Sequence, residues 1–246
     1  MKYTKEYYGR ITDIQEKVVK NELEKIEQTG TLFANTIAKD GSLFAFGASH
    51  AGIIAEEMFY RTGGLALVNP IFSPTLMLNT RPANLTSQME RLEGFGSALL
   101  STSAAKAGDV LLVHSVSGRN AVAIDMAIKA KEMGIATVVI TNLTYSKQVT
   151  SRHSSGKKLY DLGDIVIDNH GDFEDASLEI PGLGQKIAAT SSVIGCMIAN
   201  MIITATVEAL MEIGHDVPVF HSANVDGGDA FNAEIFSKYR DRIHYM

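Results

Sequence analysis

The spacing of hydrophobic residues along the chain changes from helical to strand-like near residue 40. Residues 5–28 carry apolar side chains mostly three and four positions apart, which predicts an amphipathic helix. Gly30 predicts an end to that helix, and residues 31–38 predict a second, short helix. Residues 42–47 then form an unbroken apolar run that ends in glycine, a pattern typical of a buried strand.

Beyond residue 42, predicted strands and helices alternate. Further strands are predicted at residues 65–68, 110–116, 135–141 and 164–168, and helices at residues 51–62, 85–105, 121–133 and 184–213. Residues 69–82 hold three of the five prolines and predict a loop or lid. Unbroken apolar strands that alternate with helices are typical of a parallel sheet covered on both faces. The expected fold is therefore α/β, a three-layer αβα sandwich.

Composition narrows the class of protein further. The chain has 246 residues, of which 46% are hydrophobic and 20% charged, values typical of a globular protein of one or two domains. The formal net charge is −6, and no more than two basic residues stand in a row. Because binding to a phosphate backbone requires a basic face, we expect no nucleic-acid partner.

Three features bear on the compartment. The single cysteine, Cys196, excludes an internal disulfide, and the N-terminal segment lacks the apolar core of a signal peptide, so we expect a cytoplasmic protein. The most apolar stretch, residues 187–211, has 17 apolar residues in 25 but is interrupted by polar ones. We interpret it as a buried core helix that also lines a subunit interface. We expect no membrane partner. We expect the protein to form a homodimer or a homotetramer.

Two turns between a strand and a helix contain candidate chemistry, because parallel sheets bind ligands at the carboxyl ends of their strands. The first turn contains Gly47, Ser49 and His50. Its serine and histidine are candidate ligand contacts, or else a helix cap and a solvent-exposed histidine.

The second turn is Ser115-Val-Ser-Gly-Arg-Asn120. Gly118 permits a tight turn before the helix begins, and backbone N–H groups at a helix N-terminus bind anions. The hydroxyls of Ser115 and Ser117 and the amide of Asn120 add further donors, so the turn can hold a phosphate without a lysine. The alternative is that Ser117 only caps the helix.

Several other motifs are absent or weak. The phosphate loop with its lysine, the dinucleotide-binding glycine pattern and the Gly-x-Ser-x-Gly nucleophile turn are all missing. The acidic and histidine residues lack metal-ligand spacing, so we expect neither a metal nor another cofactor. Arg152, Lys157 and Lys158 form a basic loop that either steers an anionic substrate or is simply solvated.

Residues 42–142 resemble the SIS (sugar isomerase) domain. The segments that carry the resemblance are LFAFGASHAGIIAEEMFYRTGG and GDVLLVHSVSGRNAVAIDMAIKAKEMGIATVVITN. The resemblance implies a five-stranded, flavodoxin-like parallel sheet that binds phosphosugars, and it is strongest to uncharacterised phosphoheptose-isomerase-like proteins. We expect N-terminal helices over residues 1–40, an SIS domain over 41–214 and a tail over 215–246 that completes the site.

The resemblance also implies roles for single residues. Ser49, Ser115, the backbone of Val116, Ser117, Gly118 and Asn120 would bind the phosphosugar. Glu57 matches the glutamate that removes a proton in heptose isomerases, but Val193 stands where those enzymes have the partner histidine. His221 in the tail is the preferred substitute acid by analogy, and His50 is its rival.

The function that these implications favour is a cofactor-free aldose–ketose isomerase that acts on a sugar phosphate through an enediol. One alternative is a phosphosugar ether-cleaving lyase, since those enzymes also have a glutamate on the first helix of the domain. Another is a non-catalytic phosphosugar sensor that regulates a partner protein. The 40 or so residues before the first strand are too few for an upstream helix-turn-helix domain.

Overall fold

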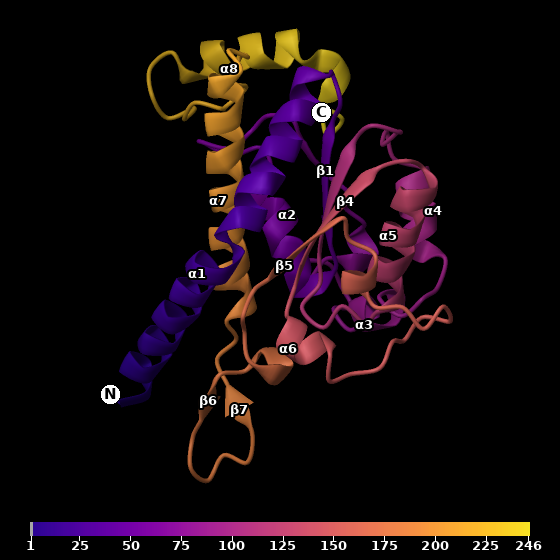
Figure 1. Cartoon of the computed structure of the whole chain (residues 1–246), viewed down its shortest axis with the longest axis vertical. Helices are drawn as coiled ribbons and strands as arrows, with labels where there is room; N and C mark the ends of the chain where they lie inside the picture. The colour runs from indigo at the N-terminus through magenta and orange to yellow at the C-terminus, as the bar shows by residue number, and fades with distance from the viewer. Residues whose placement is uncertain (1) are drawn as a thin grey trace.

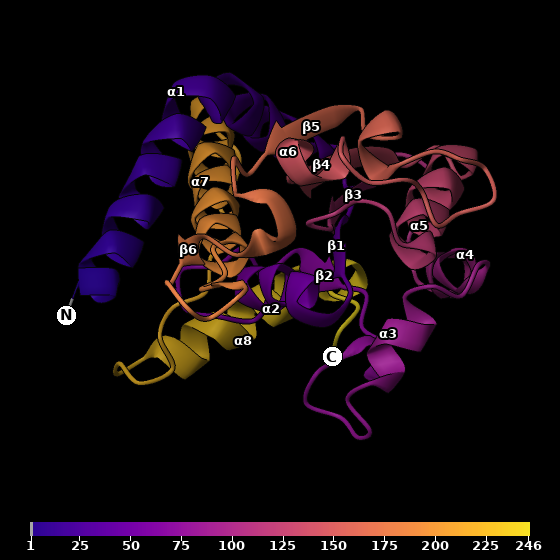
Figure 2. The same ribbon diagram turned by 90° about the horizontal axis from the view of Figure 1, so that it is seen from below.

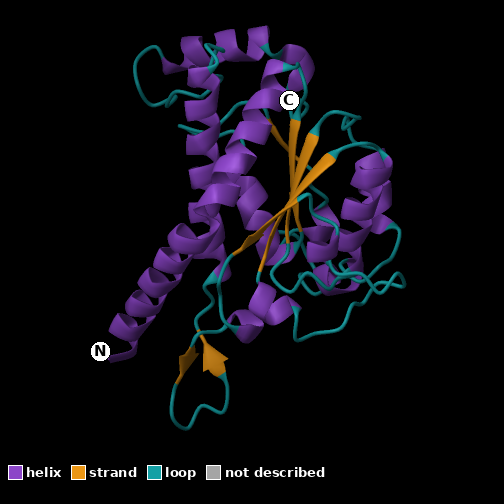
Figure 3. Cartoon of the chain, in the orientation of Figure 1, coloured by secondary structure: helices purple, strands orange, loops and turns teal. Residues whose placement is uncertain are grey.

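The computed structural model describes residues 2–246, and a five-stranded parallel sheet lies at its centre (Figures 1 and 3). The strand order is β2-β1-β3-β4-β5, and every neighbouring pair is parallel. The strands are β1 (Leu43–Gly47), β2 (Val68–Pro70), β3 (Val110–His114), β4 (Ala136–Thr141) and β5 (Ile165–Asp168). The predicted parallel α/β sheet is confirmed.

Alternation along the strands divides the core into two layers, because successive side chains of a strand point to opposite faces. Leu43 and Ala45 of β1 pack with α1 (Lys2–Ala38), α2 (Ile53–Met58) and α7 (Ser191–Glu212). Phe44 and Phe46 pack instead with α4 (Phe95–Ser101) and α5 (Ala121–Glu132). Helices therefore cover both faces, as Figure 2 shows from below, and the three-layer sandwich is confirmed.

The N-terminal region is one helix, and the predicted break at Gly30 is wrong. Gly30 is buried where α1 crosses α7, and a Cβ atom at this position would lie 2.5 Å from Cβ of Ala205. The glycine is therefore needed for close contact between two helices and not for a turn. Figure 1 shows α1 and α7 side by side over part of their lengths.

The long apolar helix begins later than predicted. The strand β7 (Lys186–Ile187), which pairs with β6 (Leu178–Glu179) in a hairpin, occupies the start of the predicted range 184–213, and α7 begins at Ser191. By length and composition alone, α7 is apolar enough to cross a membrane. It packs against α1 and α2 along one side, while Val193 and Met211 remain exposed on the other.

Two other predicted helices are shorter than expected. Residues 51–62 form a 3-10 turn, η1 (Ser49–Gly52), followed by α2, while β2 begins at Val68 and not at residue 65. Residues 85–105 form two helices, α3 (Leu85–Met89) and α4. The backbone of Gly94, just before α4, is left-handed with φ 84°, so one helix cannot continue through this position.

The C-terminal tail packs against the layer that contains α1 and α7. It carries α8 (Gly228–Lys238), and its side chains Phe220, Ile235 and Ile243 are buried in that core. The side chain of Asn69 in β2 fixes the end of the tail, because its Oδ1 accepts from the His244 backbone N–H at 2.7 Å. A short helix, α6 (Leu143–Ser146), directly follows β4.

Candidate functional site

The candidate site lies at the carboxyl ends of β1 and β3. These two strands are adjacent in the sheet, and their following connections leave on opposite sides, which is where open parallel sheets bind ligands. A pocket of about 190 Å³ opens there. Its lining residues are Ala48, Ser49, His50, Ala51, Glu90, His114, Ser115, Val116, Ser117, Asn120, Val122, Ala123, Tyr145 and Asp175. We call it the cradle pocket.

The turn after β3 hydrogen-bonds to the rest of the protein through its carbonyl groups. Its residues Val116, Ser117 and Asn120 line the pocket, whereas Gly118 and Arg119 do not. The Thr141 hydroxyl donates to the carbonyls of Ser115 and Val116, and the Leu159 N–H donates to that of Gly118. Within residues 2–246, none of the five backbone N–H groups of residues 116–120 donates a hydrogen bond. Consecutive unpaired N–H groups form an anion-binding concavity.

Gly118 makes this turn possible. Its φ is +58°, which places it in the left-handed region, and a Cβ atom would lie 3.1 Å from the hydroxyls of both Ser146 and Thr141. Either condition alone disfavours any other residue here. The strand-to-helix turn is thereby held against α6 and β4.

The serine hydroxyls around the turn are also without partners. In the part of the chain that the structure describes, the side chains of Ser49, Ser115 and Ser117 make no hydrogen bond to protein. The residue that caps α5 is Asn120, and its side chain makes no capping bond. The alternative interpretation of Ser117 as a helix cap is therefore wrong, and its hydroxyl remains available to a ligand.

The turn after β1 has a constrained backbone. Ser49 has φ +58°, an unusual conformation for a residue with a side chain. At Gly47, a Cβ atom would lie 2.2 Å from the carbonyl oxygen of Ala51, so the chain reverses direction too tightly for any larger residue. His50 follows on the exposed side of the pocket. Both predicted turns therefore line one pocket.

Asn120 links the pocket to two charged residues. Its Nδ2 donates to Oε2 of Glu90 at 2.6 Å, and its Oδ1 accepts from Arg152 at 2.9 Å. One amide hydrogen therefore remains for a ligand. Burial is the largest cause that raises the pKa of the Glu90 carboxyl, and the hydrogen bond from Asn120 and the nearby Arg91 and Arg152 oppose it.

Three arginines surround this side of the pocket. Burial and the proximity of Arg119 and Arg91 lower the pKa of Arg152, so the three guanidinium groups lie close enough to repel one another. Throughout residues 2–246, none of these arginines forms an ion pair with a carboxylate. Guanidinium groups without a carboxylate partner attract an anionic ligand. Of the basic loop, Arg152 is the residue that reaches this region.

His114 forms the buried floor behind the serines. It is 2% exposed, and burial is the largest cause that lowers its pKa, so the ring is neutral near pH 7. Its Nδ1 lies 3.0 Å from the carbonyl oxygen of Ala51, which accepts only, so Nδ1 carries the proton. Its Nε2 is then an acceptor, and it is buried with no partner among the described residues.

The predicted Glu57 and His221 lie outside the cradle pocket. Glu57 on α2 pairs with Arg61 and accepts from Nδ2 of Asn200 on α7 at 2.8 Å. His221 lines a different cavity of about 270 Å³, together with Arg61 and Asn232. The Asn232 side chain bonds both the N–H and the carbonyl of His221, at 2.9 and 3.0 Å.

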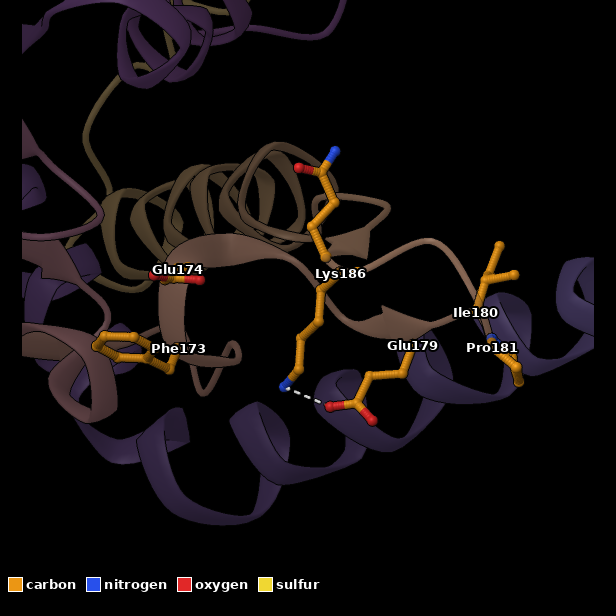
Figure 4. Close-up of a pocket in the computed structure, with 8 residues that line it drawn as sticks. Phe173, Glu174, Glu179, Ile180, Pro181 and Lys186 are labelled. Carbon is orange, nitrogen blue, oxygen red and sulfur yellow. Dashed lines mark ion pairs between the residues drawn. The ribbon is translucent and has the colours of Figure 1, made fainter.

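A larger cavity of about 550 Å³ lies beside the β6–β7 hairpin (Figure 4). Lys186 points toward Glu179 in the figure, and their charged atoms are 3.8 Å apart. Both side chains are largely solvent-exposed and lie on a two-stranded hairpin. We therefore place the candidate site at the cradle pocket, where polar groups lack partners, despite its smaller volume. Residues 2–246 contain no cluster of three or more metal-ligating side chains.

Sequence reasoning missed Glu90, His114 and Asp175 as members of this pocket. Asp175, from the loop before β6, accepts from the backbone N–H of Ser191 at 2.9 Å and so fixes the start of α7. Glu90 lies in a segment predicted to be one helix and Asp175 lies in a loop, and no motif marks either residue. His114 directly precedes Ser115, so its position beside the turn motif could have identified it.

The sequence profile of the SIS domain matches residues 6–142, more than half of the chain. A UPF0309 protein from Oceanobacillus iheyensis is 52% identical, and one from Shouchella clausii is 51% identical, each over the full length of both chains. A UPF0309 protein from Streptomyces coelicolor is 38% identical over 95% of this chain and 93% of its own.

Two solved structures share the fold. A phosphoheptose isomerase from Neisseria gonorrhoeae aligns with a TM-score of 0.52 at 19% identity, covering 85% of this chain and 97% of the isomerase. Another phosphoheptose isomerase, from Francisella tularensis, gives a TM-score of 0.55 at 12% identity, covering 83% and 96%. These likenesses agree with the family resemblance that the turn motifs carry.

Proposed function

Because the chain belongs to the SIS domain family, we propose that it binds a sugar phosphate whose phosphate group lies in the turn 115–120. The observation that carries this proposal is the polarised turn. Its carbonyl groups are satisfied by other parts of the protein, whereas five consecutive N–H groups and two serine hydroxyls have no partner in residues 2–246. A phosphate dianion is the ligand that such a set of donors fits.

The reaction that we propose is aldose–ketose isomerisation of the bound sugar through an enediol, without a cofactor. It needs a base beside the reacting carbon and a proton donor near the oxygen atoms. Glu57 is the candidate base by family resemblance. Its carboxylate is oriented by Arg61 and Asn200.

A non-catalytic sensor of sugar phosphates is the second candidate function. One observation favours it, namely that neither Glu57 nor His221 lines the cradle pocket. A sensor needs the phosphate-binding turn alone, whereas an isomerase also needs proton transfer at the sugar. The ether-cleaving reaction has no separate support in the geometry.

Calorimetric titration of Ser117→Ala with a panel of pentose, hexose and heptose phosphates tests the binding proposal. A hydrogen bond to a charged acceptor contributes about 1.5–3 kcal/mol, so affinity should fall by roughly one to two decades. Ser101→Ala is the matched control, because its hydroxyl is exposed and already donates to the carbonyl of Ser97. Equal affinity of Ser117→Ala and wild type would contradict the proposal.

We also propose that a second copy of the chain covers the exposed side of α7, and that the protein acts in the cytoplasm. Val193, Ile213 and Met211 are 44%, 54% and 67% exposed on or just after a helix that is otherwise apolar. Apolar surface of this kind is typical of a subunit interface. Light scattering should give at least a dimer, and a stable 27-kDa monomer would contradict this proposal.

A further inference from the structure

Of the two carboxyl groups that line the cradle pocket, Glu90 is the one with an oxygen that has no partner in residues 2–246, because both oxygens of Asp175 accept from Ser191. Glu90 follows α3 in the connection to α4 and lines the pocket together with Ser117 and Asn120. Its backbone carbonyl accepts from the N–H of Val122 in the first turn of α5, at 3.1 Å. The residue is therefore anchored to the same helix whose N-terminus forms the proposed phosphate site.

Only one of its carboxyl oxygens has a partner. Oε2 accepts from Asn120 at 2.6 Å, and Oε1 makes no hydrogen bond to residues 2–246. Glu57 differs, because its carboxylate pairs with the guanidinium of Arg61, accepts from Asn200 and lies outside the cradle pocket. Glu93 differs as well, because it lies outside the pocket lining and accepts from the backbone N–H of Ser154.

Partial burial of Glu90 favours its neutral, protonated form. Burial is the dominant cause and raises the pKa of the carboxyl, although His50, Arg91 and Arg152 lie near enough to favour the charged form. A raised pKa makes a carboxyl group better suited to donate a proton to an oxygen atom and take it back than a glutamate of ordinary pKa.

We propose that Glu90 carries protons to and from the oxygen atoms of the sugar phosphate in the cradle pocket, an inference that rests on the isomerase function proposed above. It would fill the role of the acid for which the sequence offered only His221 and His50. His221 lies in a different cavity, and the His50 side chain is on the exposed side of this one.

The proton transfers balance in two steps. In the first step the base removes the proton from the carbon beside the carbonyl, and the Glu90 carboxyl gives its proton to the carbonyl oxygen, which forms the enediol. In the second step the Glu90 carboxylate takes the proton from the other enediol hydroxyl, and the base returns its proton to the former carbonyl carbon. Both protein groups end as they began.

The test compares Glu90→Gln with wild type and with Glu93→Gln. Glutamine keeps an oxygen that accepts from Asn120, so the fold and the turn are preserved while the transferable proton is lost. With the sugar-phosphate panel in D₂O, turnover and incorporation of deuterium at carbon should fall by about 10²- to 10⁴-fold in Glu90→Gln. They should remain near wild type in Glu93→Gln, which removes a carboxylate from the same connection.

Two further readouts separate proton transfer from a merely structural role. Calorimetric affinity of Glu90→Gln for the sugar phosphates should stay close to that of wild type. In wild type, kcat/KM should decline as the pH rises through the pKa of Glu90, because the protonated carboxyl is the donor, and this decline should be absent in Glu90→Gln.

Each remaining outcome has a distinct meaning. Wild-type turnover in Glu90→Gln would overturn the assignment of Glu90 and leave the isomerase proposal standing. An affinity loss as large as the loss of turnover would also overturn it, because Glu90 would then act only by positioning Asn120. Binding by wild type without any turnover would reject both the isomerase and the role of Glu90, and would favour the sensor. Absence of binding would reject the proposed function itself.

Discussion

The cradle pocket and the cavity lined by His221 both contain polar groups, but they differ in whether those groups have hydrogen-bond partners in the protein. At the two turns that border the cradle pocket, the N–H groups of residues 116–120 and the hydroxyls of Ser49, Ser115 and Ser117 have no partner within residues 2–246. Near the other cavity, Arg61 pairs with Glu57 and Asn232 bonds both backbone groups of His221. Polar groups without partners are costly unless a ligand or water satisfies them, so they mark a binding site better than polar composition does.

The largest expected difference concerns the tight turns beside the two cavities. Gly47→Ala places a methyl group 2.2 Å from a backbone oxygen, and overpacking against a rigid backbone costs about 3 kcal/mol or more of unfolding free energy. In Gly63→Ala, beside the His221 cavity, the added methyl group has no neighbour within 4 Å. The only penalty is the left-handed φ of 76°, which costs about 1–2 kcal/mol of unfolding free energy. Urea denaturation of both variants measures the difference, and equal midpoints would show that the turn at Gly47 relaxes.

A smaller difference is expected between a side chain that stabilises the fold, Asn232, and one that binds the ligand, Ser117. Asn232→Ala removes the two bonds to the backbone of His221 and should lower the unfolding free energy by about 1 kcal/mol. Sugar-phosphate affinity should not change, because this side chain lies outside the cradle pocket. Ser117→Ala should instead lower sugar-phosphate affinity and leave the unfolding free energy nearly unchanged, because the Ser117 hydroxyl caps no helix. Loss of affinity in Asn232→Ala would indicate that the ligand binds at the cavity lined by His221 and not at the cradle pocket.

The smallest effect is a change in the pH dependence of stability. His114 is buried and neutral with a lowered pKa, so the unfolded chain binds a proton at this residue more readily than the folded protein does. Stability from this residue is complete above the unfolded pKa of about 6.5 and is lost as the pH falls from there through the folded pKa. Denaturation between pH 7 and pH 5 should show a shallower loss in His114→Gln than in wild type. An identical slope in both proteins would mean that His114 is protonated as readily when folded.

The comparison also explains what sequence alone could predict. The five strands and the turn at residues 115–120 follow from local pattern, since apolar runs and a Ser-x-Ser-Gly turn occupy consecutive positions. Gly30 was misinterpreted because a glycine at a helix crossing and a glycine at a helix end look alike in sequence. Glu90 was missed because its place in the pocket depends on the folded path of residues 85–95, which no motif encodes.

We propose above all that the backbone N–H groups of residues 116–120 bind the phosphate of a sugar phosphate. Titration of ¹⁵N-labelled protein with sugar phosphates, followed by amide NMR, tests it at those atoms. We predict that the resonances of Val116, Ser117, Gly118, Arg119 and Asn120 shift strongly and saturably, and that unphosphorylated sugars leave them in place. Unchanged resonances at these residues, together with shifts around Arg61, His221 and Asn232, would contradict the account.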